Sequence, residues 1–143
     1  MSKKIPDISV SLVRTEEEMN LVKDIRYRVF VIEQNVPQEI EYDEFEAAAT
    51  HVIAFIGDQA VGTARWRSTD LGFKLERFAV PADQRGRGVG AALVDFVLNQ
   101  LEDPSRAYLN SQVSAIGFYE KLGFKAIGEV FYEAGIPHKK MVL

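Results

Sequence analysis

Apolar and polar positions alternate at the start of the chain and then change to a helical spacing. Residues 8–14 alternate with a period of two, which is typical of a half-buried strand. Thr15 and Glu18 have the spacing of a capping box, and the carboxylates of the first turn suit the helix dipole, so a helix should begin here. Helical spacing continues through Leu21, Val22, Ile25, Val29 and Ile32. We expect this face to be buried and the helix to fade over residues 33–37.

Three further alternating segments are separated by turn signals. Residues 51–56 and 61–67 flank the dipeptide Gly57-Asp58, which predicts a hairpin. A second turn leads into a strand over residues 73–80. Pro81 should end this strand, because proline has no N–H group for the hydrogen-bond ladder. The three strands therefore predict an antiparallel meander.

The last third of the chain predicts two helices and three strands. Apolar residues recur at helical spacing from Ala91 to Leu101. A short strand over residues 107–109 should run parallel to the strand over 73–80, because a helix joins the two in a right-handed crossover. The remaining expected elements are a helix over 113–122 that Gly123 closes, and strands over 124–132 and 139–143 joined by a turn at 135–137.

The predicted element order is β-α-β-β-β-α-β-α-β-β. It describes an α+β fold with a mixed, mostly antiparallel sheet and flanking helices. A length of 143 residues favours a single domain over residues 1–143. The fourth strand leads into the crossover helix through a glycine-rich turn, and we expect a crevice for an elongated ligand there, at the carboxyl ends of the strands.

Composition excludes several classes of protein. The 47% apolar content is enough for a core, and the net charge of −4 argues against nucleic acid as a partner. The chain has no cysteine, so it has no disulfide, thiol nucleophile or thiolate metal ligand, and we expect no metal site. No apolar run approaches the ~20 residues that span a bilayer. The first residues lack the apolar core of a signal peptide, which predicts a cytoplasmic protein without membrane association.

An acidic run between residues 38 and 49 has two interpretations. It contains Glu39, Glu41, Asp43, Glu44 and Glu46. The simpler interpretation is a solvated loop or short helix. The alternative is an acidic rim that attracts a cationic substrate.

Glycines at alternate positions form the most informative stretch of the chain. Gly86, Gly88 and Gly90 precede a helix, where free backbone N–H groups and the helix dipole favour an anion. Arg85 and Arg87 add positive charge, so the turn predicts a pyrophosphate site. The order of elements does not fit a Rossmann fold, and the Walker lysine is absent. The competing interpretation is a tight turn before a buried helix.

Two motifs together resemble the GNAT N-acetyltransferase superfamily. The first is Arg85-x-x-Gly88-x-Gly90 opening a helix after a meander, and the second is Ala115-x-x-x-Tyr119-Glu-Lys-Leu-Gly-Phe124. The order of elements fits that family from about residue 8 to residue 143. The resemblance implies the GNAT acyl-CoA N-acyltransferase fold and an enzyme of the acyltransferase class.

A closer resemblance is to the small bacterial acetyltransferases of the ElaA and YjcF type. It is carried by Arg26-x-x-Val-Phe-Val-x-Glu33-Gln34, Glu41-x-Asp43, His51 and Gly135-Ile-Pro-His138. In this family the end of the first helix borders the acceptor pocket, so Arg26, Glu33 and Gln34 are candidate substrate-binding residues. Their alternative role is to fix the loop.

The resemblance also implies the residues that hold acetyl-CoA. The pyrophosphate would be bound by the amides of Arg85, Gly86, Arg87, Gly88, Val89, Gly90 and Ala91. The pantetheine arm would run like an extra strand beside Phe78, Ala79 and Val80. Gln112 stands where many relatives carry asparagine, and its longer side chain offers the same amide groups. Asn110 is a weaker substitute.

Tyr119 and Glu76 are the candidate catalytic residues. Tyr119 stands at the position of the family's general acid, and proton donation to a leaving thiolate is feasible for a phenol. Glu76 is the first candidate for the base that deprotonates the attacking amine, although it is also suited to pairing with Arg65 or Arg67 within the sheet. Further candidates for the base are Glu33, Asp43, His51 and His138.

These residues predict direct acetyl transfer from acetyl-CoA to a primary amine, on a small molecule or a peptide. The absence of cysteine argues against a covalent intermediate. The alternatives are a non-catalytic acyl-CoA sensor of the same fold and a phosphate-binding domain without a CoA role. The sequence leaves open the identity of the acceptor and whether the chain forms a homodimer.

Overall fold

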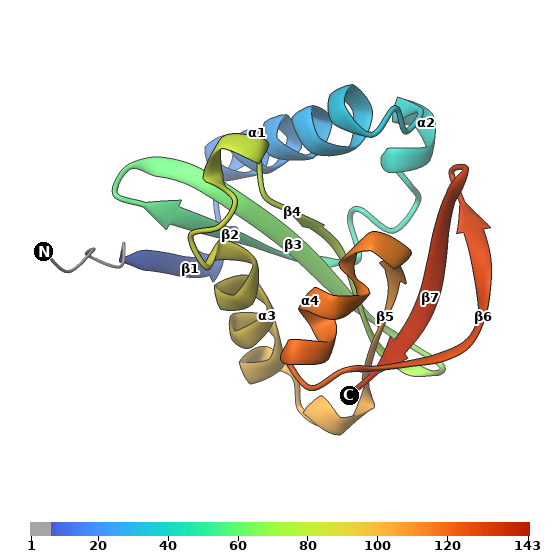
Figure 1. The fold of residues 1–143 in the computed structure, drawn as a ribbon. Helices are drawn as coiled ribbons and strands as arrows, with labels where there is room; N and C mark the ends of the chain where they lie inside the picture. Colours follow the sequence, from blue (N-terminus) through green and yellow to red (C-terminus); the bar gives the residue numbers. More distant parts are fainter. Residues whose placement is uncertain (1–6) are drawn as a thin grey trace, which may run out of the picture.

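A single mixed sheet of seven strands organises the molecule (Figure 1). The structure is a computed structural model that describes residues 7–143; the N-terminal stretch on which the signal-peptide expectation rests lies outside them. Along the sheet the strand order is β1-β2-β3-β4-β5-β7-β6. The strands are β1 (Ile8–Leu12), β2 (Thr50–Ile56), β3 (Gln59–Thr69), β4 (Gly72–Ala79), β5 (Ala107–Gln112), β6 (Lys125–Glu133) and β7 (Ile136–Val142).

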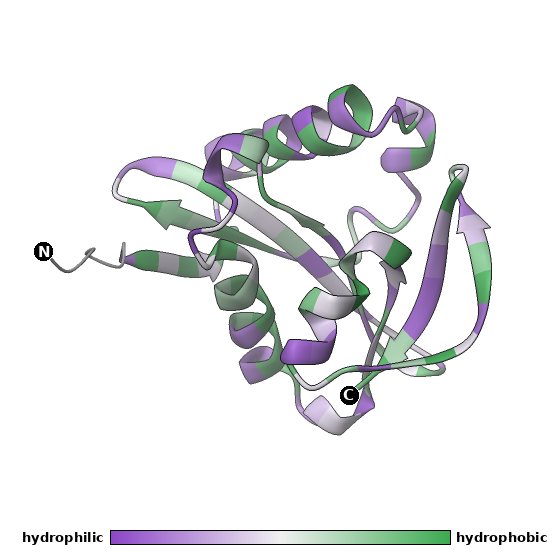
Figure 2. Cartoon of the chain, in the orientation of Figure 1, coloured by the Kyte–Doolittle hydropathy of each residue, from purple (hydrophilic) through white to green (hydrophobic). Residues whose placement is uncertain are grey.

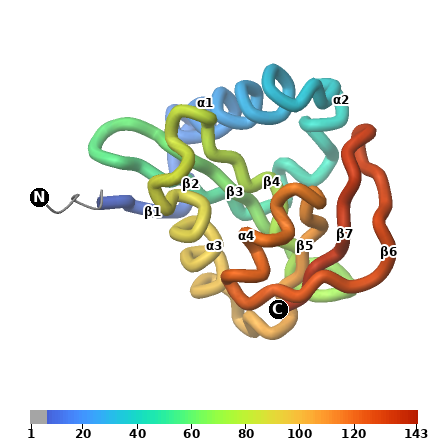
Figure 3. The backbone as a smooth tube through the Cα atoms, in the orientation of Figure 1, coloured from blue at the N-terminus to red at the C-terminus, as the bar shows by residue number. Residues whose placement is uncertain are grey.

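Helices cover both faces of this sheet. They are α1 (Glu16–Arg26), a π-helical segment (Tyr27–Glu33), α2 (Gln38–Glu41), α3 (Val89–Gln100) and α4 (Ile116–Lys121), with 3₁₀ turns at Ala82–Gln84, Pro104–Arg106 and Val113–Ala115. The backbone tube shows α3 and α4 on one face and α1 with α2 on the other (Figure 3). Within residues 7–143, no helix is long and apolar enough to cross a bilayer.

The pairing of the strands confirms the expected topology. β2, β3 and β4 form an antiparallel meander, and β5 runs parallel to β4 after the α3 crossover. Several predicted boundaries were wrong. β5 continues to Gln112, because it pairs with β7 as far as the pair Gln112–His138. β7 begins at Ile136, where it pairs with Glu133 of β6. Pro137 does not interrupt β7, since it lies at the start of the strand, beside the edge strand β6.

The first helix matches its prediction at the N-terminus but not along its apolar face. The Thr15 side chain accepts a hydrogen bond from the Glu18 amide, and the Glu18 carboxylate accepts from the Thr15 amide, which confirms the capping box. Ile32, however, is 61% exposed. The winding widens into a π-helix from Tyr27, so the spacing of 3.6 residues no longer holds there. Arg26 takes a fully buried position on this helix instead, and Figure 2 shows hydrophobic and hydrophilic residues mixed along it.

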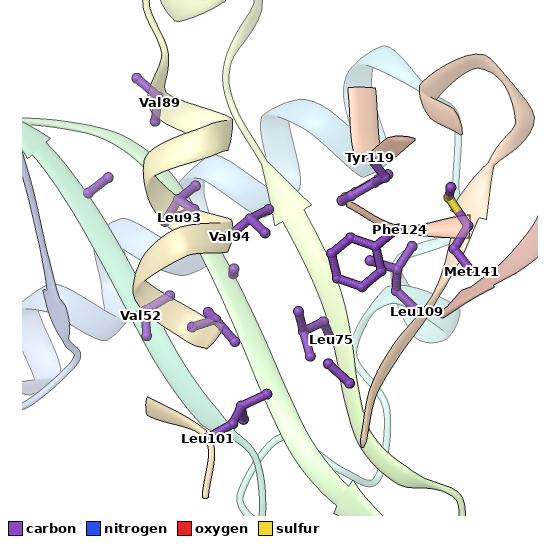
Figure 4. Packing of buried hydrophobic residues seen from close by; sticks show 14 of the residues in the cluster. Val52, Leu75, Val89, Leu93, Val94, Leu101, Leu109, Tyr119, Phe124 and Met141 are labelled. Carbon is purple, nitrogen blue, oxygen red and sulfur yellow. The ribbon is translucent and has the colours of Figure 1, made fainter. Parts of the chain in front are cut away.

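The main core lies between the sheet and α3 with α4. Leu93 and Val94 of α3 pack with Leu75 of β4, and Leu109 and Met141 extend the cluster onto β5 and β7 (Figure 4). A second, smaller cluster under α1 holds Ile25, Val29 and Ala79. The sheet thus has an apolar face toward α3 and α4. The face toward α1 and α2 is apolar near Ala79 and charged further along β3 and β4.

β4 contains a bulge that sets which side chains reach each face. Thr63 lies opposite Ala79 and Arg65 lies opposite Glu76, so two residues of β4 oppose one residue of β3. Arg77, inside the bulge, has a left-handed backbone with φ of 58°. The extra residue lets Glu76 and Ala79 share a face although they are three positions apart.

Candidate functional site

β4 and β5 separate after a short paired stretch, and this opening forms the candidate site. They pair only from Phe73 to Leu75 on β4 and from Ala107 to Leu109 on β5. Beyond these pairs a cavity of about 870 Å³ is lined from both faces of the sheet. Because the two strands diverge, backbone groups of β4 past Leu75 are left without partners from β5, and an extended ligand can pair with them.

The glycine turn forms one end of this cavity. Gly86 and Gly88 have φ of 78° and 88°, a left-handed conformation that side chains disfavour, and Gly88 is the N-cap of α3. A Cβ on Gly90 would lie 3.0 Å from the Phe118 ring. No side chain of residues 7–143 caps the helix. The first amides of α3 are therefore available to an anion, and the tight turn before a buried helix, which was the competing interpretation, is also present.

The arginines of the turn are held by other protein groups. Arg85 donates two hydrogen bonds to Glu33, at 2.8 and 2.7 Å, and its Nε donates to the Val80 carbonyl at 2.9 Å. The hydrogen bond from Arg85 lowers the pKa of Glu33. Arg87 donates to Gln84. An anion at this turn would therefore meet backbone amides more than these guanidinium groups. Glu33 does not line the cavity; it ties the π-helical segment to the turn.

Tyr119 lies in the apolar wall of the cavity. Its ring meets Phe78, Phe118 and Phe124 edge to face, at centroid distances of 6.1, 4.9 and 6.0 Å. Burial raises the pKa of Tyr119, so the phenol keeps its proton throughout the neutral range. The structure therefore brings Tyr119 and Phe78 together beside the opening between β4 and β5.

Glu76 lines the same cavity but is bound by cations. Its Oε1 accepts hydrogen bonds from Arg65 Nε at 3.1 Å and from Arg67 Nε at 2.7 Å. Lys74 Nζ lies 3.5 Å from Glu76 Oε2. The pairing with Arg65 and Arg67 that the sequence offered as an alternative is thus present, and it occupies Oε1, whereas only Lys74 approaches Oε2.

The acidic run begins as a short helix, α2, as the simpler interpretation allowed, and Glu39 and Glu44 are exposed, but its other three carboxylates are bound within the protein and form no acidic rim. Glu41 and Glu46 bind the buried Arg26, and Asp43 and Glu46 bind the buried Arg65. These carboxylates are neutralised by arginines that lie far away in the sequence. Burial raises the pKa of Asp43, but the hydrogen bond and charge of Arg65 outweigh it and hold the pKa at about 2. Asp43 is therefore a poor base at neutral pH.

Arg26 and Gln34, two predicted substrate-binding residues, have different positions. Arg26 is 1% exposed, all of its guanidinium nitrogens bind Glu41 or Glu46, and it does not line the cavity. Its position corresponds to the alternative role of fixing the loop. Gln34 lines the cavity and accepts a hydrogen bond from Gln112 at 2.7 Å. This bond joins the segment after the π-helix to the end of β5.

The two histidines occupy contrasting environments. His51 Nε2 lies 2.9 Å from the Glu46 carbonyl, and the ring lies outside the cavity. His138 lines the cavity on β7, opposite Gln112 of β5. Its Nδ1 lies 2.7 Å from the Ile136 carbonyl, and its Nε2 lies 3.9 Å from Glu133. A carbonyl can only accept, so Nδ1 carries the hydrogen, and Nε2 of a neutral ring then carries a lone pair.

Some cavity residues were missed by sequence reasoning. Among them are Phe45, Arg67, Lys74, Arg77 and Glu133. Their only sequence signal is the alternation of β3 and β4, which places Arg67 and Lys74 opposite each other. The loop residue Phe45 carries no such signal.

Comparisons with known proteins agree with this geometry. The family description "Acetyltransferase (GNAT) domain" matches residues 12–143. The chain is 38% identical over 134 residues to the N-acetyltransferase YjcF of Bacillus subtilis, covering 92% of this chain and 96% of that one. It is 33% identical over 121 residues to the protein ElaA of Escherichia coli, covering 80% and 79%.

Solved structures give the same picture. The crystal structure of Escherichia coli ElaA superposes with a TM-score of 0.79 at 27% identity and covers 94% of this chain and 98% of that chain. An acyl-CoA N-acyltransferase from Pseudomonas aeruginosa superposes with a TM-score of 0.75 at 25% identity, covering 95% and 97%. The predicted fold class is thereby confirmed.

Proposed function

Because the chain belongs to the GNAT acetyltransferase family, we propose that it moves an acetyl group from acetyl-CoA directly to a primary amine. The observation that carries this proposal is one cavity that reaches from the glycine turn to Tyr119, Glu76 and His138. No cysteine is present to form a thioester with the enzyme. The Pseudomonas neighbour is described as an acyl-CoA N-acyltransferase, which supports an acyl-CoA donor.

The donor would be held mainly by backbone groups. The amides from Arg85 to Ala91 suit a pyrophosphate, because the left-handed Gly86 and Gly88 open the turn and the α3 dipole attracts anions. The arm would pair with the free edge of β4 at Phe78, Ala79 and Val80. The Val80 carbonyl already accepts from Arg85, so the arm would use other groups there. Gln112 lies at the opposite wall.

Tyr119 would donate a hydrogen bond to the departing sulfur. Acetyl-CoA supplies an activated carbonyl carbon, which the amine nitrogen attacks while the carbon–sulfur bond breaks. The leaving thiolate has a pKa near ~8.5, below that of a phenol, so a hydrogen bond from Tyr119 stabilises it as it forms. Burial raises the pKa of Tyr119 and keeps this donor protonated.

We assign the proton-accepting role to His138 ahead of Glu76. The amine must lose a proton as the new carbon–nitrogen bond forms, and His138 Nε2 has a free lone pair when Nδ1–H donates to Ile136. Glu76 already accepts hydrogen bonds from two arginines. His138→Gln should lower turnover by about 10²-fold. If Glu76→Gln lowers turnover by that factor and His138→Gln does not, Glu76 is the base.

A thiol-release assay with acetyl-CoA and a panel of amines tests the proposed function. We expect release of CoA thiol that depends on the amine, together with donor binding in calorimetry. The alternative, a non-catalytic acyl-CoA sensor, is favoured by one observation, the engagement of Glu76 by cations. Tight donor binding without amine-dependent release for any amine would establish the sensor and contradict the enzyme.

A further inference from the structure

We propose that the acceptor amine also carries an anionic group, and that Arg67 and Lys74 bind this group. The inference rests on the proposed function, because it names the class of amine that the same cavity would accept. It replaces the cationic substrate that the acidic run suggested.

Arg67 and Lys74 form one cationic wall of the cavity. They are register partners on β3 and β4, so their side chains leave the same face of the sheet side by side. Both line the cavity and both approach the carboxylate of Glu76, at 2.7 and 3.5 Å. The two cationic groups therefore converge on the face of the sheet toward α1 and α2, which is opposite α3 and its glycine turn.

Several N–H groups of Arg67 and Lys74 have no hydrogen-bond acceptor among residues 7–143. Arg67 donates a hydrogen bond to Glu76 only through its Nε, and no acceptor among residues 7–143 binds its two Nη atoms. Its guanidinium lies 3.7 Å from the centre of the Phe45 ring, which holds the group in place while leaving its edge open. Lys74 Nζ has only the 3.5 Å approach to Glu76, longer than a good hydrogen bond.

The charge balance around the wall favours an anion. A single network of ion pairs connects the cations Arg26, Arg65, Arg67, Lys74 and Arg77 with the carboxylates Glu41, Asp43, Glu46 and Glu76. Each carboxylate of this network serves at least two cations. An anionic group would supply the missing negative charge, whereas a cationic acceptor would meet an excess of positive charge at close range.

The opposite wall suits the amine end of the same molecule. In the strand order, the β6–β7 hairpin lies across β5 from the Arg67–Lys74 wall. It contributes Glu133 and His138 to the cavity. Glu133 has no arginine or lysine partner within residues 7–143. An acceptor with a carboxylate at one end and an amine at the other, such as an amino acid, would match both walls.

Matched pairs of amines test the inference. Each amino acid is compared with its carboxamide and with its decarboxylated amine, and aminoalkyl phosphates are compared with the corresponding amino alcohols. We expect kcat/KM to be at least about tenfold higher for the anionic member. Comparable or higher values for the neutral or cationic member would overturn the inference while leaving the proposed function intact. A preference for phosphates over carboxylates would identify the phosphate as the bound anion.

Binding without turnover separates the two proposals. Calorimetric titration of the CoA-loaded protein with the same matched pairs measures the charge preference even if no thiol is released. Preferential binding of the anionic member supports the anion wall when catalysis fails, and equal binding contradicts it when catalysis succeeds.

Substitutions in the wall give the matched control. Lys74→Gln should raise KM for anionic amines about tenfold and leave KM for their neutral partners nearly unchanged, and Lys74→Glu should reverse the preference. Lys74→Gln removes only a long contact, so the fold should persist. Lys125→Gln, on the exposed face of β6, is the control for loss of one positive charge. An equal rise in KM for anionic and neutral amines would mean that Lys74 does not bind the anionic group.

Discussion

The proposed donor half and the proposed acceptor half of the cavity are built in different ways. The donor half consists of backbone amides at a helix start and of aromatic rings around Tyr119. The acceptor half consists of charged side chains that pair with one another on the face of β3 and β4 toward α1 and α2. A backbone cradle depends on local conformation, whereas an ion-pair network depends on residues brought together from distant segments. The four experiments below test this contrast.

The largest expected effect is loss of stability when Arg26 is removed. Arg26→Ala leaves the buried Glu41 without its closest partner, and breaking a buried pair costs about 3–5 kcal/mol. Urea unfolding measures the loss, and Arg28→Ala is the exposed control from the same helical region. A cost below about 1 kcal/mol would show that the acceptor half does not depend on its network.

Gly88→Asp should weaken donor binding by at least about 100-fold. The substitution adds a side chain at a left-handed position and places negative charge against the site for the pyrophosphate. Gly128→Asp is the matched control, because Gly128 also has a left-handed backbone, with φ of 75°, but does not line the cavity. Calorimetry with CoA gives the affinities. Equal affinities for the two variants would remove the glycine turn as the donor site.

Tyr119→Phe should lower kcat by about 10–100-fold while leaving CoA affinity nearly unchanged. Only the hydroxyl is lost, so the edge-to-face packing on Phe78 persists. Tyr132→Phe, at an exposed position on β6, is the control. An unchanged kcat would assign Tyr119 to packing alone.

The smallest effect concerns acid unfolding. The pKa of Asp43 in the folded chain is about 2, below its usual 3.8, so its pairing stabilises the fold above pH 4 and this contribution is lost as the pH falls toward 2. Asp43→Asn should remove at most about 2 kcal/mol and flatten the slope of unfolding free energy between pH 4 and 2. An unchanged slope would show that Asp43 is not held by Arg65.

The sequence predicted the elements around the glycine turn well and the ion-pair network poorly. The glycine turn, the crossover helix and the parallel strand follow from local patterns, and the structure confirms all three elements. The partners of Arg26 lie 15 and 20 residues away, and Arg65 lies 22 residues from Asp43. No local pattern couples such residues, so the sequence alone does not reveal that the acidic run is paired with these arginines.

Two backbone irregularities were also beyond the sequence. The π-helical segment moved Ile32 outward, and the bulge at Arg77 placed Glu76 and Ala79 on one face. Neither glycine nor proline marks them, so no local sequence signal predicts them. The regular periodicities of helices and strands therefore mispredict which side chains are buried in the π-helical segment and at the β4 bulge, both of which border the site.

The short pairing between β4 and β5 has a mechanical consequence. Three residue pairs join two plates, one made of β1 to β4 and the other of β5, β7 and β6. The shared apolar core also joins the two plates, so an occupant that hydrogen-bonds along β4 would add a second connection where the strands separate. The contact between Phe78 on the first plate and Tyr119 on α4, which packs beside the second, lies next to this opening. A loaded protein should therefore hold Tyr119 more firmly than an empty one.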